Sequence, residues 1–215
     1  MQRLIVFLVA LVLAGTAAAE PAAPPRPSAP MAAQAVAEKA PEKKPPAKKP
    51  AVKSPPARDL FGTVDSPAPL AARAIGSYAK GCLAGGSALP ITGPNWQVMR
   101  LSRNRNWGHP RLLDYMERLA SDARALDGWP GLLVGDMAQP RGGPMLNGHS
   151  SHQIGLDADI WLTPMPARIL TAEEREDVIA VSMLKDPFTV DPEIWTAEHT
   201  KLIRRAASYP QVARI

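Results

Sequence analysis

The chain has 215 residues, which is enough for one domain of ordinary size, and a formal net charge of +5. The excess of positive charge lies outside the part that is expected to fold. Residues 20–58 hold eight Lys or Arg against three Glu, whereas residues 59–215 hold sixteen Lys or Arg against seventeen Asp or Glu. The expected folded part therefore lacks the basic surface of a nucleic-acid-binding module, and we predict no nucleic-acid partner.

The first 19 residues predict a signal peptide. Arg3 precedes an apolar run at residues 4–14, which is too short to span a bilayer comfortably as a helix. Small residues at 17–19 then match a cleavage site. We predict export to the periplasm by residues 1–19, with no stable membrane span after cleavage. An uncleaved N-terminal anchor is the alternative.

Residues 20–58 predict a disordered linker. Positions 21–58 contain eleven Pro and eleven Ala and no aromatic residue, so this segment cannot bury a core. Its lysines are compatible with attraction to an anionic wall or membrane surface, and equally with a plain tether.

Residues 59–215 predict a single α+β domain. Pro110, apolar residues at helical spacing and Gly128 predict a helix over 109–128. Strands are expected over 131–137 and 155–162. Thr171 and Glu174 form a capping-box pattern that opens a helix expected to run through residue 184. A last helix is expected over 191–208, and residues 211–215 predict the start of another strand.

The pattern that indicates chemistry is an eleven-residue window after a glycine-rich loop. It contains His149, His152, Asp157 and Asp159, and the two carboxylates lie on one face of the expected strand. A turn at Gly155 would let imidazole and carboxylate converge on a divalent cation. His152 and Asp159 form a His-x6-Asp pattern, with His149 and Asp157 as a further ligand or as supporting groups. The alternative is two loop histidines and a solvated Asp pair.

The stretches "NRNWGHPRLLDYMERLA", "LLVGDMAQPRGG" and "NGHSSHQIGLDADIWL" resemble the penicillin-insensitive murein endopeptidases. The resemblance runs from about Ile75 to the end. It implies a zinc peptidase of the lysostaphin and D-Ala-D-Ala metallopeptidase group, with a small antiparallel sheet flanked by helices. The implied reaction is hydrolysis of D-Ala to diaminopimelate cross-links in peptidoglycan. The resemblance also implies that His152 and Asp159 hold Zn²⁺, with His149 beside it.

The resemblance further assigns Asp186 to a second metal, although its companion histidine is replaced here by Thr189. It places the third zinc ligand and the general base in a later His-x-His segment, along with the partner of Cys82. We therefore expect a domain without its C-terminal part, which binds zinc weakly and hydrolyses little. The competing hypothesis is a non-catalytic periplasmic protein that binds or tethers peptidoglycan. The remaining histidines, His109 and His199, are expected at a helix entry and in packing or at the surface.

Overall fold

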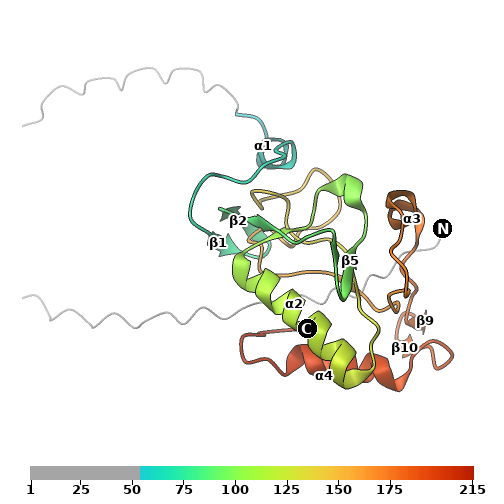
Figure 1. Cartoon of the computed structure of the whole chain (residues 1–215). Helices are drawn as coiled ribbons and strands as arrows, with labels where there is room; N and C mark the ends of the chain where they lie inside the picture. The colour runs from blue at the N-terminus through green and yellow to red at the C-terminus, as the bar shows by residue number, and fades with distance from the viewer. Residues whose placement is uncertain (1–53) are drawn as a thin grey trace, which may run out of the picture. The chain divides into compact units, whose positions relative to one another are not determined.

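The computed structural model describes residues 54–215 (Figure 1), so the predicted signal peptide and nearly all of the predicted linker lie outside the described residues. The expected α+β class is confirmed. In chain order the elements are α1 (Ala57–Gly62), β1 (Arg73–Ser77), β2 (Lys80–Ala84), β3 (Ser87–Ala88), β4 (Thr92–Gly93), β5 (Trp96–Val98), the 3₁₀ helix η1 (Leu101–Arg103), β6 (Trp107–Gly108), α2 (Pro110–Asp127), β7 (Leu132–Val134), β8 (Ile160–Trp161), α3 (Ala172–Asp177), β9 (Leu184–Asp186), β10 (Thr189–Val190) and α4 (Ala197–Ala207).

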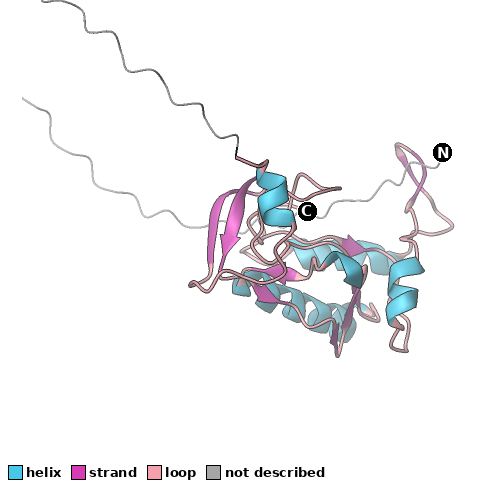
Figure 2. Ribbon diagram, turned by 90° about the horizontal axis from the view of Figure 1, so that it is seen from above, coloured by secondary structure: helices cyan, strands magenta, loops and turns pink. Residues whose placement is uncertain are grey.

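The largest sheet has four short strands in the order β4-β5-β7-β8. Its outer pairs are antiparallel, whereas β5 and β7 are parallel. This parallel pair is possible because α2 supplies the long crossover that parallel neighbours need. The pairs β1–β2, β3–β6 and β9–β10 are antiparallel and two-stranded. In Figure 2, the β1–β2 hairpin and the β9–β10 hairpin lie at opposite ends of the described part.

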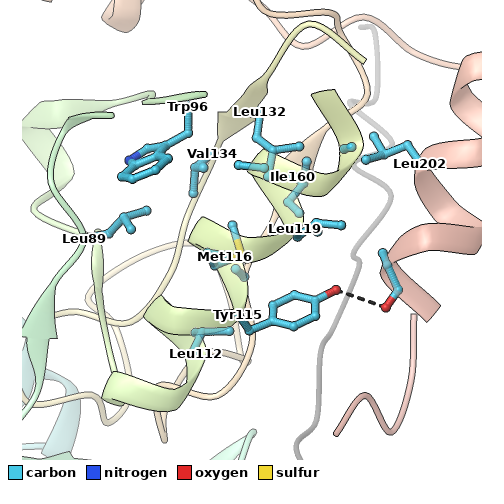
Figure 3. Packing of buried hydrophobic residues seen from close by; sticks show 14 of the residues in the cluster. Leu89, Trp96, Leu112, Tyr115, Met116, Leu119, Leu132, Val134, Ile160 and Leu202 are labelled. Atoms are coloured by element: carbon cyan, nitrogen blue, oxygen red, sulfur yellow. Dashed lines mark hydrogen bonds between the residues drawn. The ribbon is translucent and has the colours of Figure 1, made fainter. Parts of the chain in front are cut away.

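The main core lies where α2 packs against both the sheet and α4 (Figure 3). α2 begins at Pro110, as predicted, and His109 caps it by accepting a hydrogen bond from a backbone N–H two residues on. Every side chain of the buried α2 face is less than 10 % exposed, and its residues are Leu112, Leu113, Tyr115, Met116, Leu119, Ala120 and Ala123. Burying one such large apolar side chain stabilises the fold by about 1.5–3 kcal/mol.

The expected helix over 172–184 is shorter than predicted. The capping box of Thr171 and Glu174 is present, but α3 ends at Asp177 and β9 begins at Leu184. The backbone N–H of Arg100 donates a hydrogen bond to the carbonyl of Arg175. In a longer helix, this carbonyl would instead accept a hydrogen bond from the backbone N–H four residues later. This tertiary contact ends the helix where the local sequence would have continued it.

The expected start of the last helix and the expected final strand are also wrong. A turn closed on the Asp191 carbonyl occupies the predicted first helical residues, and Thr196 then caps α4. Val212 and Ile215 pack against the core as partly buried residues, but residues 211–215 form no named strand. Among residues 54–215, none of the helices combines the length and apolar character that crossing a bilayer requires.

Candidate metal centre

The loop that follows β7 is anchored at several points before it reaches β8. Gly143 N–H donates to the Gln153 carbonyl at 2.9 Å, and Gln153 N–H donates to the Tyr78 carbonyl at 3.1 Å. His109 N–H, at the start of α2, donates to the carbonyl of Gly155 at 2.8 Å. Gly155 has a φ of +67°, so the turn expected at this residue is present. The loop is thus held between the β1–β2 turn and the N-terminus of α2.

This anchoring brings three of the predicted ligands together. The ligand atoms of His149, His152 and Asp159 all lie within 4.8 Å of one another. The carboxylate oxygens of Asp159 lie 3.6 Å from Nε2 of His149 and 3.5 Å from Nε2 of His152. His152 and Asp159 are buried, whereas His149 is half-buried and gives the cluster an open side.

Two unpartnered buried atoms support a divalent cation at this point. Nε2 of His152 and Oδ1 of Asp159 make no hydrogen bond within the described part of the chain, although both are buried. Leaving such atoms unpaired costs about 1–3 kcal/mol each. Two ligand atoms about 2.0–2.2 Å from a tetrahedral ion lie roughly 3.3–3.6 Å apart, which matches their 3.5 Å separation. The donors present therefore fit a metal ion.

Asp157 supports the cluster from behind His152. Its Oδ2 lies 2.9 Å from Nδ1 of His152 and accepts a hydrogen bond from the His152 backbone N–H at 3.0 Å. His152 has a φ of +62°, a strained value for a residue with a side chain. Burial alone would lower the pKa of His152, but the carboxylates of Asp157 and Asp159 outweigh it and raise this pKa to about 10 in the metal-free protein.

Sequence reasoning missed Asp136, which lies one residue past a glycine at the end of β7. Its Oδ2 contacts Nε2 of His149 at 3.1 Å, Nη1 of Arg105 at 2.7 Å and Nη1 of Arg103 at 3.0 Å. Burial raises the pKa of Asp136, but the contacts with His149 and Arg105 and the charge of Arg103 outweigh burial and hold it well below its usual range. An acidic residue two positions after the apolar run Leu132–Val134 was the signal that could have identified it.

The other predicted residues lie outside the cluster. Asp186 is exposed on β9, where its carboxylate accepts a hydrogen bond from the Phe188 backbone N–H, and Thr189 lies across the hairpin on β10. Cys82 is a half-buried free thiol on β2. His199 is buried, with its ring 5.0 Å from that of Trp129, and its Nε2 contacts a backbone carbonyl at 2.9 Å. His199 and His109 therefore have the packing and helix-entry roles that were predicted.

An α+β domain with a buried His and Asp cluster on a glycine-rich loop is the class of protein that this fold and site define. The penicillin-insensitive murein endopeptidase family matches residues 74–215, and the chain belongs to that family. The resemblance seen in the sequence is thus confirmed.

Curated relatives carry the same family name. A penicillin-insensitive murein endopeptidase of Haemophilus influenzae is 45% identical over 141 residues, which are 66% of this chain and 49% of that protein. A protein of the same name from Klebsiella pneumoniae is 36% identical over 144 residues, or 67% of this chain and 52% of that protein. One from Salmonella paratyphi B is 38% identical over 152 residues, or 71% and 55%. The chain spans about half the length of the curated relatives that it matches.

Proposed function

We propose that this protein is a zinc-dependent endopeptidase of peptidoglycan, exported to the periplasm by residues 1–19. Its substrates are the peptide cross-links between D-Ala and diaminopimelate. The unpartnered pair of His152 Nε2 and Asp159 Oδ1, with His149 beside it, carries the proposal. The names of the relatives, which are murein endopeptidases, support the substrate class.

The donor set favours zinc over magnesium or calcium. Imidazole nitrogen is a typical zinc ligand, whereas magnesium and calcium prefer sites made of oxygen atoms. Zinc bound here would lower the pKa of a coordinated water and polarise the scissile carbonyl. Three protein donors and one open position are the usual arrangement of a catalytic zinc site.

The residues around the cluster have distinct tasks in this proposal. Asp157 holds a proton on Nδ1 of His152, so that the lone pair of Nε2 faces the ion. Asp159 supplies a negative charge that compensates part of the charge of the ion. His149 Nε2 lies between Asp136 and Asp159, where it offers a third donor at the open side of the cluster.

A second candidate function is binding of wall peptide without hydrolysis. The resemblance assigns the general base to a His-x-His segment, and residues 1–215 contain no such pair. Of the four histidines, His109 caps α2 and His199 packs between tryptophans, so neither is free to act as a base. Because these two imidazoles are occupied, residues 54–215 offer no free histidine outside the cluster, and this favours binding of wall peptide without hydrolysis by the described part of the chain.

The two functions are separated by titrating the full chain with zinc in a calorimeter and digesting purified cross-linked wall peptides. An enzyme would release monomeric peptides, lose this activity with a chelator and regain it with zinc. Binding of peptide without release of monomers would support the second candidate. His152→Ala should abolish zinc binding at the cluster. His109→Asn is the matched control, because it removes an imidazole but keeps a good helix cap. Equal zinc affinity in the two variants would reject the site.

A further inference from the structure

One positively charged side chain beside the cluster is left over after its neighbours are paired. The single carboxylate of Asp136 faces both Arg103 and Arg105, so this group of three carries one excess positive charge. The Arg105 side chain is 9% exposed, and its second terminal nitrogen donates to the backbone and side-chain oxygens of Asn147. The Arg103 side chain is 45% exposed and, among the described residues, uses only Nη1, on Asp136. Arg103 therefore keeps donors available for a ligand.

The backbone that carries Arg103 is strained and tightly held. Arg100 and Asn104, on either side of η1, have φ values of +57° and +50°. Such angles cost of order 1–3 kcal/mol each and persist only where other contacts enforce them. Here the Glu176 carboxylate of α3 accepts hydrogen bonds from the backbone N–H and hydroxyl of Ser102, at 2.7 and 3.0 Å. The turn that carries Arg103 is thus fixed, and the contacts of Nη1 with both oxygens of Asp136 hold its guanidinium beside the cluster.

Arg103 also lies close to the candidate metal ligands. Its Nη1 and the Nε2 of His149 both touch the same oxygen of Asp136, at 3.0 and 3.1 Å. The distance between the two nitrogens therefore cannot exceed the sum of these two contact distances. A group that the guanidinium binds would lie within a few bonds of a carbonyl placed at the cluster.

We propose that Arg103 is a substrate-binding residue that recognises the free carboxylate next to the scissile bond. This inference rests on the proposed function. In a D-Ala to diaminopimelate cross-link, the acylated amine sits on a carbon that also bears a carboxylate. A guanidinium is suited to this group because its planar donors match a carboxylate with two parallel hydrogen bonds.

The test uses two cross-linked peptides that differ only at this carboxylate, which is free in one and a primary amide in the other. Binding to the full chain is measured by calorimetry without metal, and hydrolysis is measured with zinc. The variants are Arg103→Gln, Arg103→Lys and the matched control Arg204→Gln, an exposed arginine on α4. Zinc affinity is also measured for each variant. If the substitution acted only by disturbing Asp136 and His149, rather than by removing a contact with the substrate, the zinc affinity would change.

The unaltered chain should prefer the free carboxylate by about tenfold or more, as expected for a charge-assisted hydrogen bond. Arg103→Gln should remove this preference by weakening only the free-carboxylate peptide, and Arg103→Lys should keep part of it. Arg204→Gln should behave like the unaltered chain. No preference in the unaltered chain, or equal weakening of both peptides by Arg103→Gln, would overturn the inference. Preference in binding without hydrolysis would reject the endopeptidase alone, and binding of neither peptide would reject both ideas.

Discussion

One carboxylate oxygen of Asp157 holds both the ring and the backbone of His152, at 2.9 Å from Nδ1 and 3.0 Å from the backbone nitrogen. The same contact therefore fixes the imidazole and stabilises the left-handed backbone of His152. Because Nδ1 faces Asp157, the only ring nitrogen left for a metal is Nε2, which is the one that lies 3.5 Å from Asp159.

Asp157→Asn should lower zinc affinity by about 10–100-fold, the usual effect of losing a carboxylate behind a metal-bound imidazole. The asparagine amide keeps an oxygen that can accept both hydrogen bonds from His152, so the fold should survive. The negative charge that makes His152 a stronger metal ligand is lost. Calorimetry against zinc measures the change. Asp177→Asn, an exposed residue of α3, makes the same chemical change away from the cluster and should leave the affinity unaltered.

Zinc binding should release protons at neutral pH. The pKa of His152 is raised to about 10 in the metal-free protein, so its imidazole carries a proton at pH 7 that a metal must displace. Zinc affinity should therefore rise with pH up to about 10. Titrations in buffers of different ionisation enthalpy count the protons, and we expect about one per ion from this residue. A heat that does not depend on the buffer would contradict the prediction.

The same shift predicts how the stability of the metal-free protein depends on pH. A histidine whose pKa is raised on folding stabilises the folded state fully below its unfolded pKa, near 6.5, and this contribution is lost as pH rises toward 10. Urea unfolding of the metal-free chain at pH 6 and pH 9 should show lower stability at pH 9 from this group. His152→Gln should reduce that difference, whereas His109→Asn should not.

The sequence predicted the local parts of the site better than the parts made by tertiary contacts. The spacing of His149, His152 and Asp159 is local, and the turn at Gly155 is the feature that lets them meet. The expected strand over 155–162 is too long: only Ile160–Trp161 form a strand, since the chain bends at Gly155 and residues 156–159 carry no regular secondary structure. Asp136 is 23 residues before Asp159 in the chain, and only the pairing of the backbone after β7 with Asp159 brings it to the cluster.

The helices show the same division between features set by local sequence and features set by tertiary contacts. α2 followed from its proline start, its apolar spacing and its glycine end, all of which are local signals. The end of α3 depends on Arg100, which is 75 residues away from the Arg175 carbonyl that it binds. No pattern within residues 172–184 could reveal that competing donor.

Gly155→Ala should destabilise the loop and weaken zinc binding. A Cβ at this position would lie 2.7 Å from Cδ2 of Leu83 and 3.1 Å from the backbone nitrogen of His109, in addition to the strain of a φ of +67°. Gly128→Ala is a matched control, because its φ is +76° and a Cβ there meets nothing within 4 Å.

The control should lose about 1–2 kcal/mol from backbone strain alone. Gly155→Ala should lose more, and only this variant should bind zinc less tightly. Chemical denaturation and zinc titration of both variants check this. Equal losses of stability would mean that the packing around Gly155 adjusts and that the close approach of the loop to α2 is not required.

Tyr115→Phe should loosen the packing of α4 on α2 without affecting the metal centre. Tyr115 Oη donates to the carbonyl of Ala206 at 3.1 Å. Figure 3 marks this hydrogen bond of Tyr115 with a dashed line. In a continuing helix this carbonyl would accept from the residue four positions later, but that residue is Pro210, which has no N–H.

The buried hydroxyl therefore replaces a hydrogen bond that the backbone cannot make, and its loss should cost about 1–3 kcal/mol, since the carbonyl is left unpaired. Urea denaturation measures the change. Tyr78→Phe removes a hydroxyl that makes no hydrogen bond to residues 54–215 and should be near neutral. Zinc affinity should be the same in both variants, because neither hydroxyl touches the cluster. A loss of zinc binding in Tyr115→Phe would instead show that the α2–α4 packing and the metal centre depend on each other.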